Sequence, residues 1–126
     1  MSTQIYTTSL FQNADGGVTY PAGQVVFSQG DSGAEMYAVQ EGLVDLVVNG
    51  VVVETVGPGG IFGELALLDN EPRTSTAVAR VDSVLVSVDQ ARFMLMVRQT
   101  PFFAMAVMRL LARRIRATDR LVGSQE

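Results

Sequence analysis

The spacing of apolar residues divides the chain into two parts near residue 90. Before that point, short apolar and β-branched runs alternate with glycine-containing turns every 8–12 residues or so, a pattern typical of antiparallel β-proteins. We expect strands over seven segments: Val18–Tyr20, Val25–Ser28, Met36–Gln40, Leu43–Val48, Val51–Val56, Ser75–Arg80 and Ser83–Val88. Asn49-Gly50 predicts a tight hairpin turn between the fourth and fifth of these, because both residues tolerate positive φ. The sequence therefore predicts an antiparallel sandwich or roll over about residues 15–89.

Two helices are expected after the strands. Asp89 is a suitable N-cap for a helix over about Gln90–Gln99, which ends at Thr100 because the residue before a proline avoids the α region. A second helix is expected from about Phe102 to Leu121. The fold class is therefore mainly β with α, ending in helices over about residues 90–122.

The second predicted helix carries an apolar stripe with a period of 3.5 residues. One interpretation is that this stripe packs on the β-domain, and the alternative is that its C-terminal half pairs with another copy of the chain. Five arginines are expected on the other faces of the helix, where they keep it soluble. The stripe consists of Ala104, Met108, Leu111, Ile115, Thr118 and Val122.

Composition excludes several classes of protein. The chain has no Cys and no His, which removes disulfides, zinc sites, iron–sulfur clusters and histidine-based catalysis. No signal peptide is visible, and no apolar run approaches the ~20 residues that a membrane span needs. We expect a small soluble domain of the cytoplasm, without metal, cofactor or membrane.

The charges are divided unevenly along the chain. Residues 1–72 contain nine acids and no base, whereas residues 73–126 contain all nine arginines and four acids, so the formal charges are −9 and +5. An acidic chain of this kind does not suit a nucleic-acid duplex. Arg73 is the first cation in the sequence, which raises the question of what it binds.

One stretch carries candidate chemistry. A glycine-rich turn at Gly57–Gly60 precedes a short predicted helix, Glu64–Leu68, whose free backbone N–H groups would suit a phosphate. Arg73 follows, and its guanidinium could bind phosphate oxygens in a forked manner, while a carboxylate at Glu64 could accept a sugar hydroxyl. The alternative is structural: Glu64 pairs with Arg73, and the glycines form only a turn.

These residues resemble a known family. The segment Phe62-Gly63-Glu64-Leu65-Ala66-Leu67, followed after five residues by Arg73-Thr74, is similar to the phosphate-binding cassette of cyclic nucleotide-binding domains. The early glycine pattern Gly30-Asp31-x-Gly33, with Met36–Val39 and Gly42, is also similar. The resemblance covers nearly the whole chain and implies one domain, residues 1–126, with an antiparallel β-roll or jelly roll, a short cassette helix and C-terminal helices.

The resemblance also implies roles for single residues. Glu64 would accept the ribose 2′-OH and Arg73 would bind the cyclic phosphate, whereas the remaining arginines would not face the ligand. Further contacts would come from Phe62, Gly63, Leu65, Ala66, Thr74 and Ser75. Apolar residues lining the pocket would be Leu46, Val53 and Val56, and Thr118 of the last helix would reach the base.

The resemblance predicts a regulatory sensor rather than an enzyme. cAMP is favoured as the ligand, with cGMP as the alternative because Thr74 occurs with both preferences, and occupancy would be relayed through the last helix to an unidentified effector protein. Asp119 replaces a serine that bacterial members offer to the neighbouring subunit, although a homodimer through this helix is still considered. No recognition helix follows Thr118, so we expect no DNA binding. The competing hypothesis is a degenerate domain that serves protein assembly without a ligand.

Overall fold

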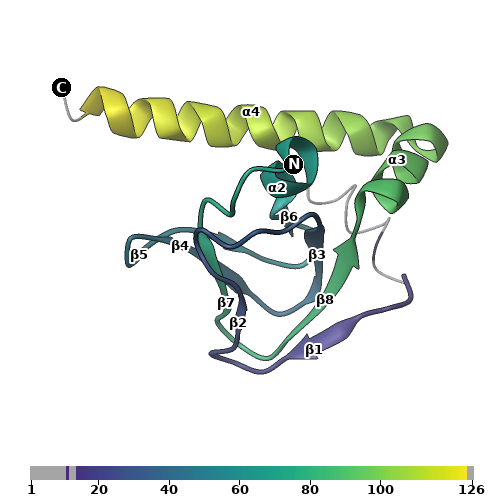
Figure 1. Cartoon of the computed structure of the whole chain (residues 1–126), viewed down its shortest axis with the longest axis horizontal. Coiled ribbons are helices and arrows are strands. Elements are labelled where there is room, and N and C mark those ends of the chain that lie inside the picture. The colour runs from purple at the N-terminus through teal and green to yellow at the C-terminus, as the bar shows by residue number, and fades with distance from the viewer. Residues whose placement is uncertain (1–10, 12–13, 125–126) are drawn as a thin grey trace.

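Eight antiparallel strands form two four-stranded sheets in the computed structural model, which describes residues 11 and 14–124, with backbone only for residues 118–124. The arrangement confirms the predicted β-roll (Figure 1). The first sheet has the order β1 (Val18–Tyr20), β8 (Ser83–Val88), β3 (Met36–Glu41) and β6 (Ile61–Phe62). The second has the order β2 (Val25–Phe27), β7 (Thr76–Ala79), β4 (Val44–Val48) and β5 (Val51–Val56).

Seven of these strands correspond to predicted segments, and β6 is the strand that the sequence pattern missed. It pairs with β3 through Tyr37↔Phe62 and Ala38↔Ile61. Two residues between glycines are too short to show an alternating pattern, so this segment resembled a turn. The β6 strand places the cassette directly against the first sheet.

The turn between β4 and β5 forms as Asn49-Gly50 indicates. Both residues have positive φ, 50° and 82°, which the tight hairpin requires. β5 pairs with β4 on one side and is an edge strand of the second sheet.

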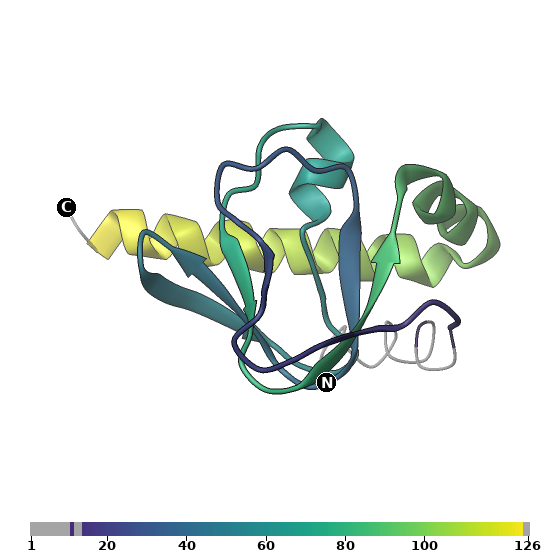
Figure 2. The same cartoon turned by 60° about the horizontal axis from the view of Figure 1, so that its bottom comes forward.

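Three helices follow from local signals. α2 (Glu64–Asp69) is the cassette helix, and α3 (Gln90–Gln99) begins where the Asp89 carboxylate accepts a hydrogen bond from the Arg92 N–H at 2.8 Å, as predicted. α4 (Pro101–Ser124) starts directly at the proline, and the chain bends by 117° between α3 and α4. In Figures 1 and 2, α4 runs across the roll.

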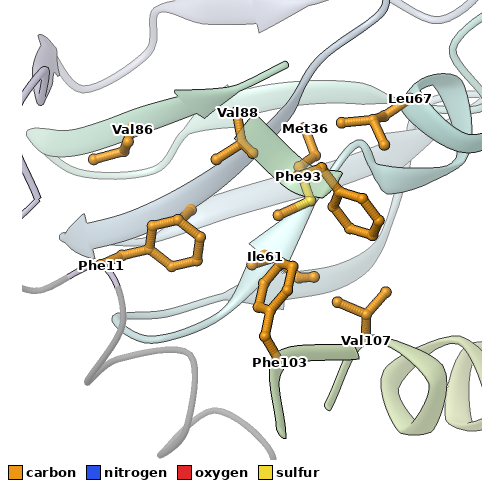
Figure 3. Close-up of a cluster of buried hydrophobic side chains, with 10 residues drawn as sticks. Phe11, Met36, Ile61, Leu67, Val86, Val88, Phe93, Phe103 and Val107 are labelled. Carbon is orange, nitrogen blue, oxygen red and sulfur yellow. The ribbon is translucent and has the colours of Figure 1, made fainter. Parts of the chain in front are cut away.

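Two hydrophobic clusters hold these layers together, and β3 contributes to both because its side chains alternate between the faces of the sheet. Tyr37 and Val39 point between the two sheets, whereas Met36 and Ala38 point toward the helices. Figure 3 shows the helix-side cluster. Its buried members are Phe11, Met36, Ala38, Ile61, Leu67, Val86, Val88, Phe93, Phe103 and Val107.

The apolar stripe of α4 does not pack on the roll as a unit. Met108 and Ile115 are 55% and 61% exposed, although Leu111 contacts the helix-side cluster. The face of α4 that packs on the roll instead carries Phe103 and Val107, which are both buried in the helix-side cluster. The interpretation that the whole stripe packs on the β-domain is therefore wrong, because these large aromatic and apolar side chains determine the rotation of the helix.

No single helix in the described part of the chain is long and apolar enough to cross a membrane. α3 and residues 101–117 of α4 would reach that length only together, and the 117° bend separates them.

Candidate functional site

A cavity of about 230 Å³ lies between the cassette, the second sheet and α4. Its floor and walls come from β2, β4, β5, the cassette segment and the helix above it. The residues around it are Phe27, Leu46, Val48, Val53, Glu54, Gly63, Glu64, Leu65, Ala66, Arg73, Thr74, Ser75, Arg114 and Ala117.

Most of the predicted site residues meet at this cavity. Nine of them line it: Leu46, Val53, Gly63, Glu64, Leu65, Ala66, Arg73, Thr74 and Ser75. Phe62 and Val56 are fully buried in the cluster between the sheets instead, and therefore support the cavity from below. The side chain of Thr118 lies outside the described residues, so its predicted contact stays a prediction.

Arg73 is the buried cation of the site. Arg73 is only 5% exposed, and its guanidinium carbon lies 4.1 Å from the centroid of the Phe27 ring. Nη1 donates to the Gly63 carbonyl at 3.1 Å, but Nε is buried and has no hydrogen-bond partner. Among the described residues, no carboxylate pairs with this guanidinium.

A buried cation without a carboxylate calls for an anion, because an isolated charge in a protein interior loses its hydration. Burial of the neighbouring Tyr37 raises the pKa of its phenol, with Tyr20 and Glu35 acting in the same direction, so this ring is neutral at pH 7 and supplies no negative charge. The unpartnered Nε–H gives a donor for a ligand oxygen. Because Glu64 forms its ion pair with Arg114 and not with Arg73, the hypothesis that Glu64 pairs with Arg73 is wrong.

Two glycines make room for the guanidinium. A Cβ atom on Gly33 would lie 2.5 Å from both Nε and Nη2 of Arg73, and one on Gly63 would lie 2.8 Å from Nη1. Gly63 also has φ of 78° and occupies the N-cap position of α2, where no side chain caps the helix. The two loops therefore approach Arg73 as closely as they do because they carry no side chain there.

Glu64 is almost fully buried, and its partner is Arg114 of α4. Arg114 Nη1 lies 2.5 Å from Oε1 of Glu64, and the same guanidinium donates from Nε and Nη2 to Glu54 at 2.9 and 3.0 Å. Nη2 also donates to the Ile61 carbonyl. Burial lowers the pKa of Arg114, but the hydrogen bonds and charges of Glu54 and Glu64 outweigh that effect and raise it.

The contact between Arg114 and Glu64 corrects the expectation that Arg73 alone among the arginines faces the site. Arg114 and Ala117 follow Phe103, Val107 and Leu110 at helical spacings of three and four, which places all five on one face. The sequence contained this signal, but the stripe of Met108 and Ile115 next to it has the same spacing and, unlike the first, is not interrupted by a charged residue. Nothing in the local sequence around Glu54 indicated a role.

The charges around the cavity balance formally, because two carboxylates face two guanidiniums. They are not distributed evenly, since Glu54 and Glu64 both bind Arg114. Arg73 is left without an acidic partner among the described residues. Within residues 11 and 14–124, no group of acidic side chains is arranged to hold a metal ion.

Comparison with known proteins gives a consistent result. Residues 17–100 match the family model described as "Cyclic nucleotide-binding domain". The chain is 36% identical over 105 residues to the cyclic AMP receptor protein of Thermus thermophilus, covering 79% of this chain and 49% of that protein. It is 48% identical over 71 residues to a cAMP-dependent protein kinase regulatory subunit of Eremothecium gossypii, covering 56% of this chain and 16% of that protein.

The fold has close structural neighbours as well. The crystal structure of Thermus thermophilus catabolite activator protein superimposes with a TM-score of 0.78 and 32% sequence identity, covering 98% of this chain and 58% of that one. The chain thus spans about half or less of the length of the curated relatives it matches.

Proposed function

Because the chain belongs to the cyclic nucleotide-binding domain family, we propose that it binds a cyclic nucleotide in the cavity beneath α4 and acts as a regulatory sensor rather than as an enzyme. The observation that carries this proposal is the buried guanidinium of Arg73, whose Nε–H has no hydrogen-bond partner. Among the described residues, no carboxylate forms an ion pair with it. A cyclic phosphate carries one negative charge and two exocyclic oxygens, and therefore suits a forked guanidinium.

Glu64 would recognise the ribose. Its carboxylate lines the same cavity as Arg73 and comes from the first residue of the cassette helix. A sugar hydroxyl can donate to a carboxylate oxygen, as an acidic residue does in dinucleotide sites. The backbone of Gly63, Leu65 and Ala66 and the hydroxyls of Thr74 and Ser75 would complete the polar contacts, while Leu46 and Val53 provide apolar surface.

cAMP is the favoured ligand, because the names of the two curated relatives refer to cAMP. cGMP is the alternative to be measured beside it. Binding would be relayed through α4, since Arg114 and Ala117 belong to that helix and also line the cavity. A ligand that contacts them gains affinity only when α4 is in place, and this differential affinity is what shifts a conformational equilibrium.

Isothermal titration calorimetry with cAMP and with cGMP tests the proposal. Wild-type protein, checked by mass spectrometry to be free of co-purified nucleotide, should bind one of them at one site per chain. Arg73→Glu should abolish binding, and Arg73→Lys should weaken it because the fork is lost. Arg98→Glu, an equal charge reversal at an exposed position of α3, is the control. Absence of binding to wild type, or unchanged affinity in Arg73→Glu, would contradict the proposal and favour an assembly module.

A homodimer through α4 is a second part of the proposal. Met108 and Ile115 project from the helix into solvent, which suits pairing with the same surface of another copy. Sedimentation equilibrium with and without cAMP measures the association. Met108→Glu should weaken a dimer, and a protein that is monomeric in both states at high micromolar concentration would rule the dimer out.

A further inference from the structure

Arg114 joins three elements that are distant in sequence. It extends from α4 and binds Glu54 of β5 through two nitrogens, Glu64 of α2 through a third, and the backbone of Ile61 in β6. Of residues 112–117, Arg114 is the one side chain that is not exposed. The part of α4 that covers the cavity is thus fastened to the roll by this guanidinium.

Glu54 contributes a distinct share of that attachment. Its two oxygens accept from Nε and Nη2 at 2.9 and 3.0 Å, a bidentate geometry that fixes orientation as well as distance. Unlike Glu64, Glu54 has no part in the proposed contact with the ribose. It can therefore hold Arg114 whether or not a nucleotide is present.

We propose that Glu54 is a positioning residue that keeps α4 docked over the cavity before the nucleotide arrives, and so sets the fraction of molecules that are ready to bind. The inference rests on the proposed function, because readiness refers to cyclic nucleotide. When only a fraction of molecules is competent, the apparent dissociation constant equals the intrinsic one divided by that fraction. Loss of Glu54 should consequently weaken binding without removing any contact to the ligand.

Glu54→Gln is the appropriate change, since it preserves size and removes the charge. Arg114 would keep Glu64 but lose its bidentate partner, so undocked positions of α4 become populated in the free protein. Affinity for cAMP should fall about 5-fold or more, the lower end of typical coupling between two sites. Glu41→Gln, the same change at an exposed position at the end of β3, should leave affinity unchanged.

The position of α4 can be measured without nucleotide. The chain has no cysteine, so spin labels can be attached at Thr19→Cys in β1 and Ala112→Cys in α4. Diluted with an excess of unlabelled protein, so that distances between two copies in a dimer do not contribute, the labelled protein reports one intramolecular distance by pulsed electron–electron double resonance. We expect one narrow distribution for the wild-type background and a second, displaced population for Glu54→Gln. Saturating cAMP should return that population to the wild-type distance.

A double-mutant cycle separates an indirect role from a direct one. If Glu54 acts through Arg114, then Glu54→Gln should cost nothing further in a protein that already carries Arg114→Met. Additive losses of affinity would show that Glu54 contacts the nucleotide itself and would overturn the proposal. So would a Glu54→Gln protein whose distance distribution or affinity equals that of wild type. Failure of the wild type to bind would contradict the proposed function instead. The distances in free protein would still test whether Glu54 keeps α4 docked through Arg114.

Discussion

Replacing Gly33 by alanine should damage the anion site while leaving the fold intact. The new Cβ would lie 2.5 Å from Nε and Nη2 of Arg73 and 2.7 Å from Cζ, closer than real Cβ atoms approach heavy atoms. The backbone of Gly33 is not in the left-handed region, so alanine adds no backbone strain there. The guanidinium must therefore move away from its present contacts, which are the hydrogen bond from Nη1 to the Gly63 carbonyl and the packing of Cζ on the Phe27 ring.

The magnitude follows from what the displaced guanidinium loses. A hydrogen bond to a charged group contributes about 1.5–3 kcal/mol, and each 1.4 kcal/mol or so corresponds to a factor of ten in affinity. If displacement removes one phosphate contact, the dissociation constant for cAMP should rise about 10- to 100-fold. Stability should change little, because the entropic benefit of alanine, about 0.4–1 kcal/mol, offsets part of the crowding.

Calorimetric titration of Gly33→Ala with cAMP measures this loss, and urea unfolding followed by circular dichroism shows whether the protein remains folded. Gly57→Ala is a matched control, since its Cβ would meet only Leu43 at an ordinary 3.5 Å. A folded Gly33→Ala protein that binds as tightly as wild type would refute the reasoning that Gly33 makes room for Arg73 at the phosphate.

Two further predictions concern stability. Phe103→Ala should lower the free energy of unfolding by about 3–5 kcal/mol in urea titrations, because Phe103 is fully buried against the rings of Phe11 and Phe93; a loss near zero would contradict its place in the core. Asp45→Asn should cost about 0.5–1 kcal/mol at pH 7. Burial raises the pKa of Asp45, but hydrogen bonds from Thr55 and Arg80 lower it below the usual 3.8 overall. The carboxylate therefore stabilises the fold above pH 3.8, and the difference between wild type and Asp45→Asn should shrink as pH falls further; a difference independent of pH would contradict this assignment.

The sequence predicted those features that depend on local signals. The Asn49-Gly50 turn, the Asp89 cap and the break before Pro101 each involve neighbouring residues, and all three form as expected. The cassette was likewise recognisable because Glu64 and Arg73 are only nine residues apart. Their short separation was enough to predict that both side chains line one cavity. The roles assigned to them stay predictions.

Features that depend on packing could not be predicted in the same way. Glu54 and Arg114 are 60 residues apart, and they meet only because the side chains of Phe103 and Val107 determine which face of α4 turns toward the roll. Met108 and Ile115, from the apolar stripe recognised in the sequence, project into solvent instead. Similarly, Val56 and Phe62 were expected at the cavity surface, but they fill the space between the sheets, where the alternation of β5 and β6 directs them.

The charge imbalance of the sequence also has a more specific meaning in the structure. Arg73 closes a base-free stretch of 72 residues, and it is the guanidinium left without a carboxylate at the cavity. Arg114 comes from the basic half of the chain but is neutralised by two acids of the acidic half. We therefore propose separate tasks for the two arginines at the cavity: Arg73 binds the ligand and Arg114 stabilises the fold.

The most direct test of the central claim is an NMR titration of the arginine Nε–H groups with cAMP. Arg73 Nε is buried and has no partner, so a cyclic phosphate bound there should shift this resonance strongly, with saturation at one nucleotide per chain. The signal is identified as the one lost in Arg73→Lys. A saturable shift confined to Arg73 and its neighbours would support the account. If cAMP at millimolar concentration leaves the Arg73 resonance unchanged, the phosphate does not bind at the site that we propose.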